Sequence, residues 1–157
     1  MGNIPIHPMV VHFPIVFALL TPVATFVALY LIRRRTKPAR AWALPLSLML
    51  ILLGSSYLAV YTGEAEEERI EAIMPEAVIE SHESAAQEFI LVVAIVGVIA
   101  LAGFARGRVG AAARGVATIG TLLIVAAGYR VGKAGGELAY QYSAAAEYIA
   151  SSAADSD

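Results

Sequence analysis

The chain has 157 residues, of which 59% are hydrophobic and 15% are charged, and its mean hydropathy is +0.71. Soluble domains carry about 25% charged residues, so this composition indicates a membrane protein. The chain contains no cysteine, which excludes disulfides, covalently attached c-type haem, iron–sulfur clusters and thiolate metal sites. The formal net charge of −2 says little by itself, because the two signs are segregated along the chain.

The apolar residues come in four long blocks, and a helix needs roughly 20 such residues to cross a bilayer. We predict an all-α fold: one polytopic membrane domain, residues 1–157, in which four spans form a helix bundle. An outer loop is expected at 63–87 and an outer C-terminal tail at 137–157, both with helical extensions. The four spans are expected at about residues 10–32, 42–61, 88–105 and 115–132.

Basic residues mark the two short connections between spans, and neither connection holds an acidic residue. The positive-inside rule therefore places both connections in the cytoplasm and the two termini and the middle loop outside. We expect a multi-pass protein of the bacterial inner membrane with both termini exocytoplasmic. The basic residues of the connections are Arg33, Arg34, Arg35, Lys37, Arg40, Arg106, Arg108 and Arg114.

All three histidines fall on the predicted outer side. His7 and His12 open the first span in the stretch IPIHPMVVHFPI, and His82 lies just ahead of the third span. Five residues of a regular helix turn by about 500°, so the rings of His7 and His12 are expected roughly 140° apart. Pro8 suits a first helical turn, whereas Pro14 removes a backbone hydrogen bond. A bent first helix is therefore expected to line a site at the outer end.

Glutamates gather on the same predicted side of the membrane. Glu64, Glu67, Glu68 and Glu71 follow the spacing i, i+3, i+4, i+7, so they share one face of a helix that continues out of the second span. Carboxylates with histidine nearby can hold a metal ion, and the alternative is a solvated helix face. For Glu64 and Glu68, closest to the membrane, both interpretations stay open.

The fourth span carries Gly128, Gly132 and Gly136 at four-residue intervals. This row favours close helix packing, and the alternative is a porphyrin lying against the glycine face. Arg130 and Lys133 sit at the outer end of the same span. A basic residue there snorkels to the interface or pairs with an anion. The candidate anions are the glutamates that follow the second span and the propionates of a haem.

Four stretches carry a resemblance to a known family: HPMVVHFPIVF at the start, YTGEAEE after the second span, ESHES before the third and GGELAY after the fourth. They are similar to an uncharacterised bacterial family of predicted four-span membrane proteins, and the similarity covers nearly the whole chain. Some relatives are joined to cytochrome c-like or other redox domains, which implies a role in exocytoplasmic electron transfer. Relatives often read HLGG and LVYxHG where this chain reads KAGG and LAYQYS. If those extra histidines are ligands in the relatives, this chain has a reduced site or a structural role.

The first functional hypothesis is a b-type haem, whose axial ligands are most often histidines. His12 and His82 lie at similar depth on different helices and are expected to clamp the haem, with His7 as the alternative to His12. Arg130 and Lys133 would meet the propionates. Such a protein would pass electrons to a periplasmic redox protein or serve as a subunit of a respiratory assembly.

Two other hypotheses stay open. One is a non-haem site for zinc, copper or iron; the other is a scaffold subunit without a cofactor. Besides the lipid bilayer, a second copy of the chain is a candidate partner, and no nucleic acid is expected to bind. Whether the protein is an enzyme is left open. The candidate ligands of the non-haem site are His7, His12, His82, Glu64 and Glu68.

Overall fold

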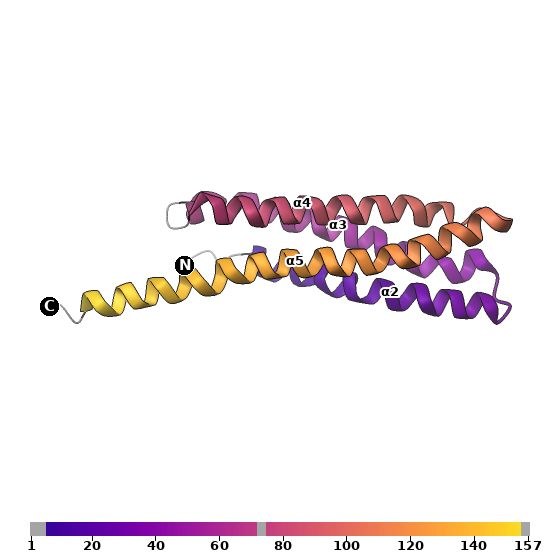
Figure 1. Cartoon of the computed structure of the whole chain (residues 1–157), viewed down its shortest axis with the longest axis horizontal. Coiled ribbons are helices and arrows are strands. Elements are labelled where there is room, and N and C mark those ends of the chain that lie inside the picture. The colour runs from indigo at the N-terminus through magenta and orange to yellow at the C-terminus, as the bar shows by residue number, and fades with distance from the viewer. Residues whose placement is uncertain (1–5, 72–74, 155–157) are drawn as a thin grey trace.

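The computed structural model describes residues 6–71 and 75–154, and their side chains except at 66–71, 138–139 and 141–154. Every regular element within these ranges is a helix, so the predicted all-α class is confirmed. The long helices lie side by side in an elongated bundle, and α5 extends past the others toward the C-terminus (Figure 1). The elements are α1 (His7–Val10), α2 (His12–Arg33), α3 (Pro38–Glu71), α4 (Glu76–Ala102) and α5 (Gly107–Ala154).

Four stretches are long and apolar enough to cross a membrane, as predicted. Each contains 27 to 31 residues, more than the roughly 20 that a span requires. The helices also continue beyond the predicted spans, so that the end of α3 and the start of α4 occupy most of the expected outer loop 63–87. The four stretches are His7–Arg33, Pro38–Ala65, Glu76–Ala102 and Gly107–Glu137.

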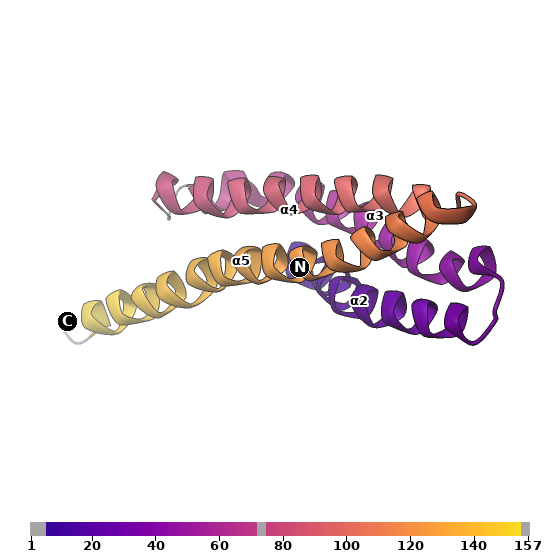
Figure 2. The same ribbon diagram turned by 45° about the vertical axis from the view of Figure 1, so that its right-hand side comes forward.

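The chain forms two helical hairpins. α2 packs mainly against α3, and α4 packs mainly against α5, while contacts between α3 and α4 and between α2 and α5 join the hairpins. Figure 2 shows the two short connections, α2 to α3 and α4 to α5, at the same end of the bundle. Arg35 and Gly107, in the two short connections, adopt positive φ angles of 74° and 67°. Antiparallel neighbours joined by short connections are the expected topology of a four-helix bundle.

The core combines a few large side chains with many small ones. Ala18 and Ala28 of α2 and Ala117 of α5 are buried, which lets the helix backbones approach closely. Trp42 is fully buried, and its indole Nε1 donates a hydrogen bond of 2.9 Å to the Ala100 carbonyl of α4. The largest fully buried hydrophobic side chains include Trp42, Met49, Leu52, Val93 and Ile124.

Several hydroxyl side chains are also buried, and each donates a hydrogen bond to a backbone carbonyl of its own helix. Their hydrogen-bonding needs are therefore met without a partner helix, as an apolar environment demands. Arg114 is 7% exposed and donates to the Gly103 carbonyl, just past the end of α4. A cation suits that position because the C-terminal end of a helix carries partial negative charge. The buried hydroxyl residues are Thr21, Thr25, Ser56, Thr118 and Thr121.

Large hydrophobic side chains are exposed along all four long helices. Soluble monomers rarely expose contiguous apolar patches beyond a few hundred square ångströms, whereas lipid tails solvate such a surface. The outer surface of the bundle is therefore suited to contact with the bilayer. Representative residues are Leu19, Phe26, Leu50, Leu91, Ile119 and Leu123.

Candidate functional site

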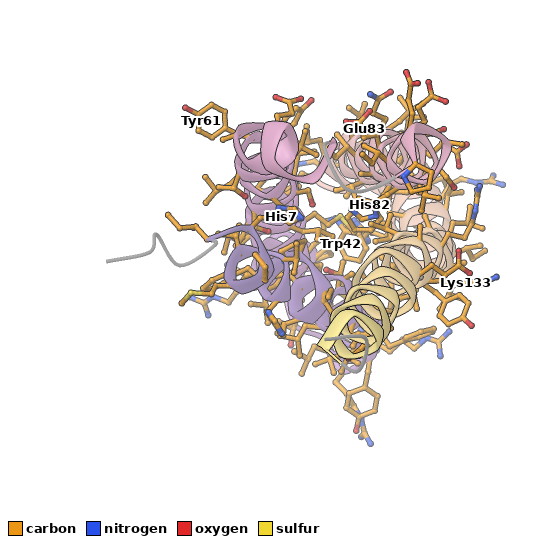
Figure 3. All side chains as sticks on the ribbon, turned by 90° about the vertical axis from the view of Figure 1, so that its left-hand side faces the viewer. His7, Trp42, Tyr61, His82, Glu83 and Lys133 are labelled. Atoms are coloured by element: carbon orange, nitrogen blue, oxygen red, sulfur yellow. The ribbon has the colours of Figure 1, made fainter. Side chains whose placement is uncertain are left out.

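Two of the three histidines turn into the bundle at the same end. His7 begins α1 and His82 lies in the first part of α4, and both are half-buried. Figure 3 looks down the bundle from this end and shows both rings directed between the helices, whereas Tyr61 and Lys133 point away. The two rings come from different helices, α1 and α4. We call His7 and His82 the histidine pair.

His7 stands at the start of α1, one short turn before α2. Val11 lies between the two helices, and its φ and ψ angles of −60° and −21° keep the chain helical there. Pro14, three residues later, has no N–H to donate to the Val10 carbonyl. α1 packs against α3, and His7 faces α3 while His12, at the start of α2, stays exposed.

The His7 ring is oriented by the backbone of α3. Its Nδ1 lies 2.8 Å from the Ala59 carbonyl oxygen and 3.3 Å from Thr62 Oγ1. A carbonyl only accepts, so the Ala59 contact requires the proton on Nδ1 and leaves the lone pair of a neutral ring on Nε2. Histidines that bind metals are commonly oriented in this way, by a hydrogen bond from one ring nitrogen to a backbone carbonyl.

The His82 ring lies against α5, next to Gly135. The buried Nδ1 has no hydrogen-bond partner within the described part of the chain. Buried polar atoms are normally paired, so such an atom calls for an explanation, and a bound group is one.

Each ring of the histidine pair rests against a glycine on another helix. A Cβ built on Gly63 of α3 would lie 3.2 Å from Cε1 and 3.3 Å from Nδ1 of His7. A Cβ built on Gly135 of α5 would lie 3.2 Å from Cε1 and 3.5 Å from Nδ1 of His82. The site thus draws on α1, α3, α4 and α5. Both glycines lie within stretches that carry the family resemblance, YTGEAEE and GGELAY, but their contacts with the two rings were not predicted.

The basic residues predicted for propionates form ion pairs on the surface of the α4–α5 hairpin. Arg130 donates to Glu88 at 2.5 Å, with side chains that are 66% and 52% exposed. Lys133 lies 3.6 Å from Glu137, one helical turn further along α5. The partner of Arg130 is thus a glutamate of α4, not one of those that follow the second span. These cations and the histidine pair face different directions.

Of the two predicted carboxylate ligands, the structure describes the side chain of Glu64 alone. Glu64 is exposed on α3, and the side chain of Glu68 lies outside the described residues. Across residues 6–71 and 75–154, no three histidine, cysteine or acidic side chains with described positions gather closely enough to hold a metal ion. The donors that the structure does bring together are two imidazoles.

The glycine row of the fourth span serves only partly in helix packing. A Cβ on Gly128 would lie 3.3 Å from the Phe89 ring of α4, whereas one on Gly132 or Gly136 would contact nothing within 4 Å. Beside this row, a shallow depression of about 220 Å³ opens on the surface of the α4–α5 hairpin. It is lined by Ser81, Ala85, Arg130, Lys133, Ala134 and Glu137.

Comparison with known proteins gives one match. Residues 3–147 match the model of a family described as a predicted membrane protein (DUF2231). No curated protein and no solved structure matches the chain. The resemblance to an uncharacterised membrane-protein family, noted from the sequence motifs, is thereby confirmed.

Proposed function

This chain belongs to the predicted membrane protein family DUF2231. From its own residues we propose that it binds a b-type haem between the histidine pair and transfers electrons. His7 and His82 would be the axial ligands. His12, the sequence-based candidate for this role, is exposed on α2 and takes no part in the proposed site.

The observation that carries this proposal is the histidine pair itself. Two imidazoles from different helices turn into the same end of the bundle. A six-coordinate haem takes two ligands from the protein, because the porphyrin supplies the other four, and histidine is the usual ligand. Two histidines contributed by different helices match that requirement.

The individual rings support the same function. The hydrogen bond from His7 Nδ1 to the Ala59 carbonyl fixes the orientation of the ring. The buried, unpartnered Nδ1 of His82 is an atom whose environment a bound group would complete. Gly63 and Gly135 have no side chain, and this leaves room for both rings. On these grounds the residues present fit a haem.

A bound haem would supply one-electron redox chemistry. The residues of the chain would hold and orient it, and the apolar bundle would keep water from one side of the site. By the charge pattern of the short connections, the site would lie at the exocytoplasmic end. Its electron partner would then be a periplasmic redox protein or a neighbouring subunit of a respiratory assembly.

The test is an absorption spectrum of the protein purified in mild detergent, first oxidised and then reduced with dithionite. We expect a Soret band and sharp reduced α and β bands with one haem per chain. His7→Ala and His82→Ala should each lose the low-spin spectrum, whereas the matched control His12→Ala should keep it. Haem retained unchanged in both histidine-pair variants would overturn the ligand assignment.

A colourless protein would overturn the haem proposal as a whole. Elemental analysis of the same sample would then distinguish the two other hypotheses. Stoichiometric zinc, copper or iron that is lost in His82→Ala would indicate a non-haem metal site. A metal-free protein would favour the scaffold function.

A further inference from the structure

The two hairpins repeat one arrangement. In the first hairpin, a histidine at the start (His7) packs on a glycine near the end of the second long helix (Gly63). In the second hairpin, His82 near the start of α4 packs in the same way on Gly135 of α5. The same distance, 3.2 Å from the glycine's built Cβ to the ring's Cε1, recurs in both.

The sequence around the two glycines repeats as well. A tyrosine stands six residues before each glycine, Tyr57 in α3 and Tyr129 in α5. Both tyrosines are exposed on the outside of the bundle, so the corresponding helices present the same face outward when their glycines face a histidine ring. The match therefore concerns the orientation of the helix and not a single contact.

The glycines leave little tolerance for a side chain. Carbon atoms pack best at about 3.5–4.0 Å, so a methyl group 3.2 Å from a ring carbon must displace the ring. For His7 the displacement has a further consequence, because the Ala59 carbonyl that accepts its Nδ1–H lies one helical turn before Gly63 on the same face of α3. A shift of the ring by a few tenths of an ångström, which the methyl group would require, would therefore change the geometry of that hydrogen bond as well.

We propose that Gly63 and Gly135 are positioning residues, each of which holds the histidine of its own hairpin so that the two hairpins contribute one imidazole each to a single shared site. The identity of the group between the imidazoles rests on the proposed function. The positioning of the two rings does not, so it can be tested without any bound group.

The first experiment uses protein from which any haem has been removed, with ¹⁵N-labelled histidine. The ring ¹⁵N shifts of wild-type protein should report a proton on His7 Nδ1. Gly63→Ala should change these shifts, and Gly135→Ala should change those of His82. The controls are Gly54→Ala in α3 and Gly136→Ala in α5, because a Cβ at either position meets nothing within 4 Å. Unchanged histidine shifts in both test variants would overturn the proposal.

A double-mutant cycle covers the case in which Gly63→Ala fails to fold. His7→Ala removes the ring that the new methyl group would strike, so the double variant should recover the thermal stability of His7→Ala alone. The same logic applies to Gly135→Ala combined with His82→Ala. A defect that persists after removal of the ring would show that the glycine serves the helix and not the histidine.

The second experiment uses the haem-loaded protein. Gly63→Ala and Gly135→Ala should shift the midpoint potential and convert part of the low-spin signal to high spin, whereas Gly54→Ala and Gly136→Ala should retain both properties. Wild-type spectra in the test variants would overturn the proposal and leave the haem assignment intact. Wild-type protein without haem would overturn the proposed function, while the ¹⁵N experiment would still decide on the positioning of the rings.

Discussion

Replacement of Trp42 should show how the bundle is held together at the end opposite the histidine pair. Trp42 is 0% exposed, and its indole nitrogen donates to the Ala100 carbonyl at 2.9 Å. That carbonyl also accepts the backbone N–H of Gly103 at 3.0 Å, so Trp42→Phe does not leave it without a partner. The lost hydrogen bond should then cost only about 0.5–1.5 kcal/mol of unfolding free energy. Trp42→Ala adds the loss of a large packed ring and should cost about 3–5 kcal/mol.

The assay is reversible unfolding in mixed micelles with increasing dodecyl sulfate, followed by far-ultraviolet circular dichroism. Leu44→Ala is the matched control, because Leu44 lies two residues away on α3 and is 58% exposed on the outside of the bundle. Truncation of this side chain changes only its contacts with lipid, so it should lower the unfolding free energy by less than about 1 kcal/mol. If Trp42→Ala were no more destabilising than Leu44→Ala, the description of this end as a packed core would be wrong.

Three further predictions follow from the connections and the ion pairs. Since the chain lacks cysteine, Glu64→Cys should react with an impermeant maleimide in intact cells and Thr36→Cys only after lysis; the reverse pattern would invert the topology. Arg114→Met should lower the unfolding free energy by about 1–3 kcal/mol, because the buried Gly103 carbonyl loses its charged donor, and an unchanged unfolding curve would contradict this. A double-mutant cycle on the exposed Glu88–Arg130 pair should give a coupling energy below about 1 kcal/mol, and a larger value would show that lipid shields the pair from water.

The number and type of the helices could be predicted because hydrophobic length is a local property of the sequence. Each block of apolar residues predicts one span independently of the other blocks. The ends of the helices could not be predicted in the same way. The segments at the end of α3 and the start of α4 are rich in glutamate, so hydropathy alone ends the spans before them. The helical spacing of the glutamates after the second span nevertheless predicted that this helix continues, as α3 does to Glu71.

The sequence identified candidate side chains of the site but not which of them face one another. The sequence indicated that His7 and His12 point in different directions, yet it could not show which of them faces His82, because that depends on how α1 packs against α3. The glycines under the rings were visible in sequence only as isolated motif positions. Likewise, Glu88 becomes the partner of Arg130 because α4 and α5 are neighbours, and tertiary packing of this kind leaves no local signal.

The length of α5 limits the directions from which a folded partner could approach the histidine pair. Its 48 residues correspond to a rod of about 72 Å, more than twice the roughly 30 Å of bilayer hydrocarbon. The excess projects as a column past the end of the bundle where the histidine pair lies (Figure 1). A small diffusing molecule passes such a column freely, whereas a folded protein must approach from the sides that the column leaves open. The length of a single helix would thereby restrict the approach of folded proteins to the histidine pair without restricting small molecules.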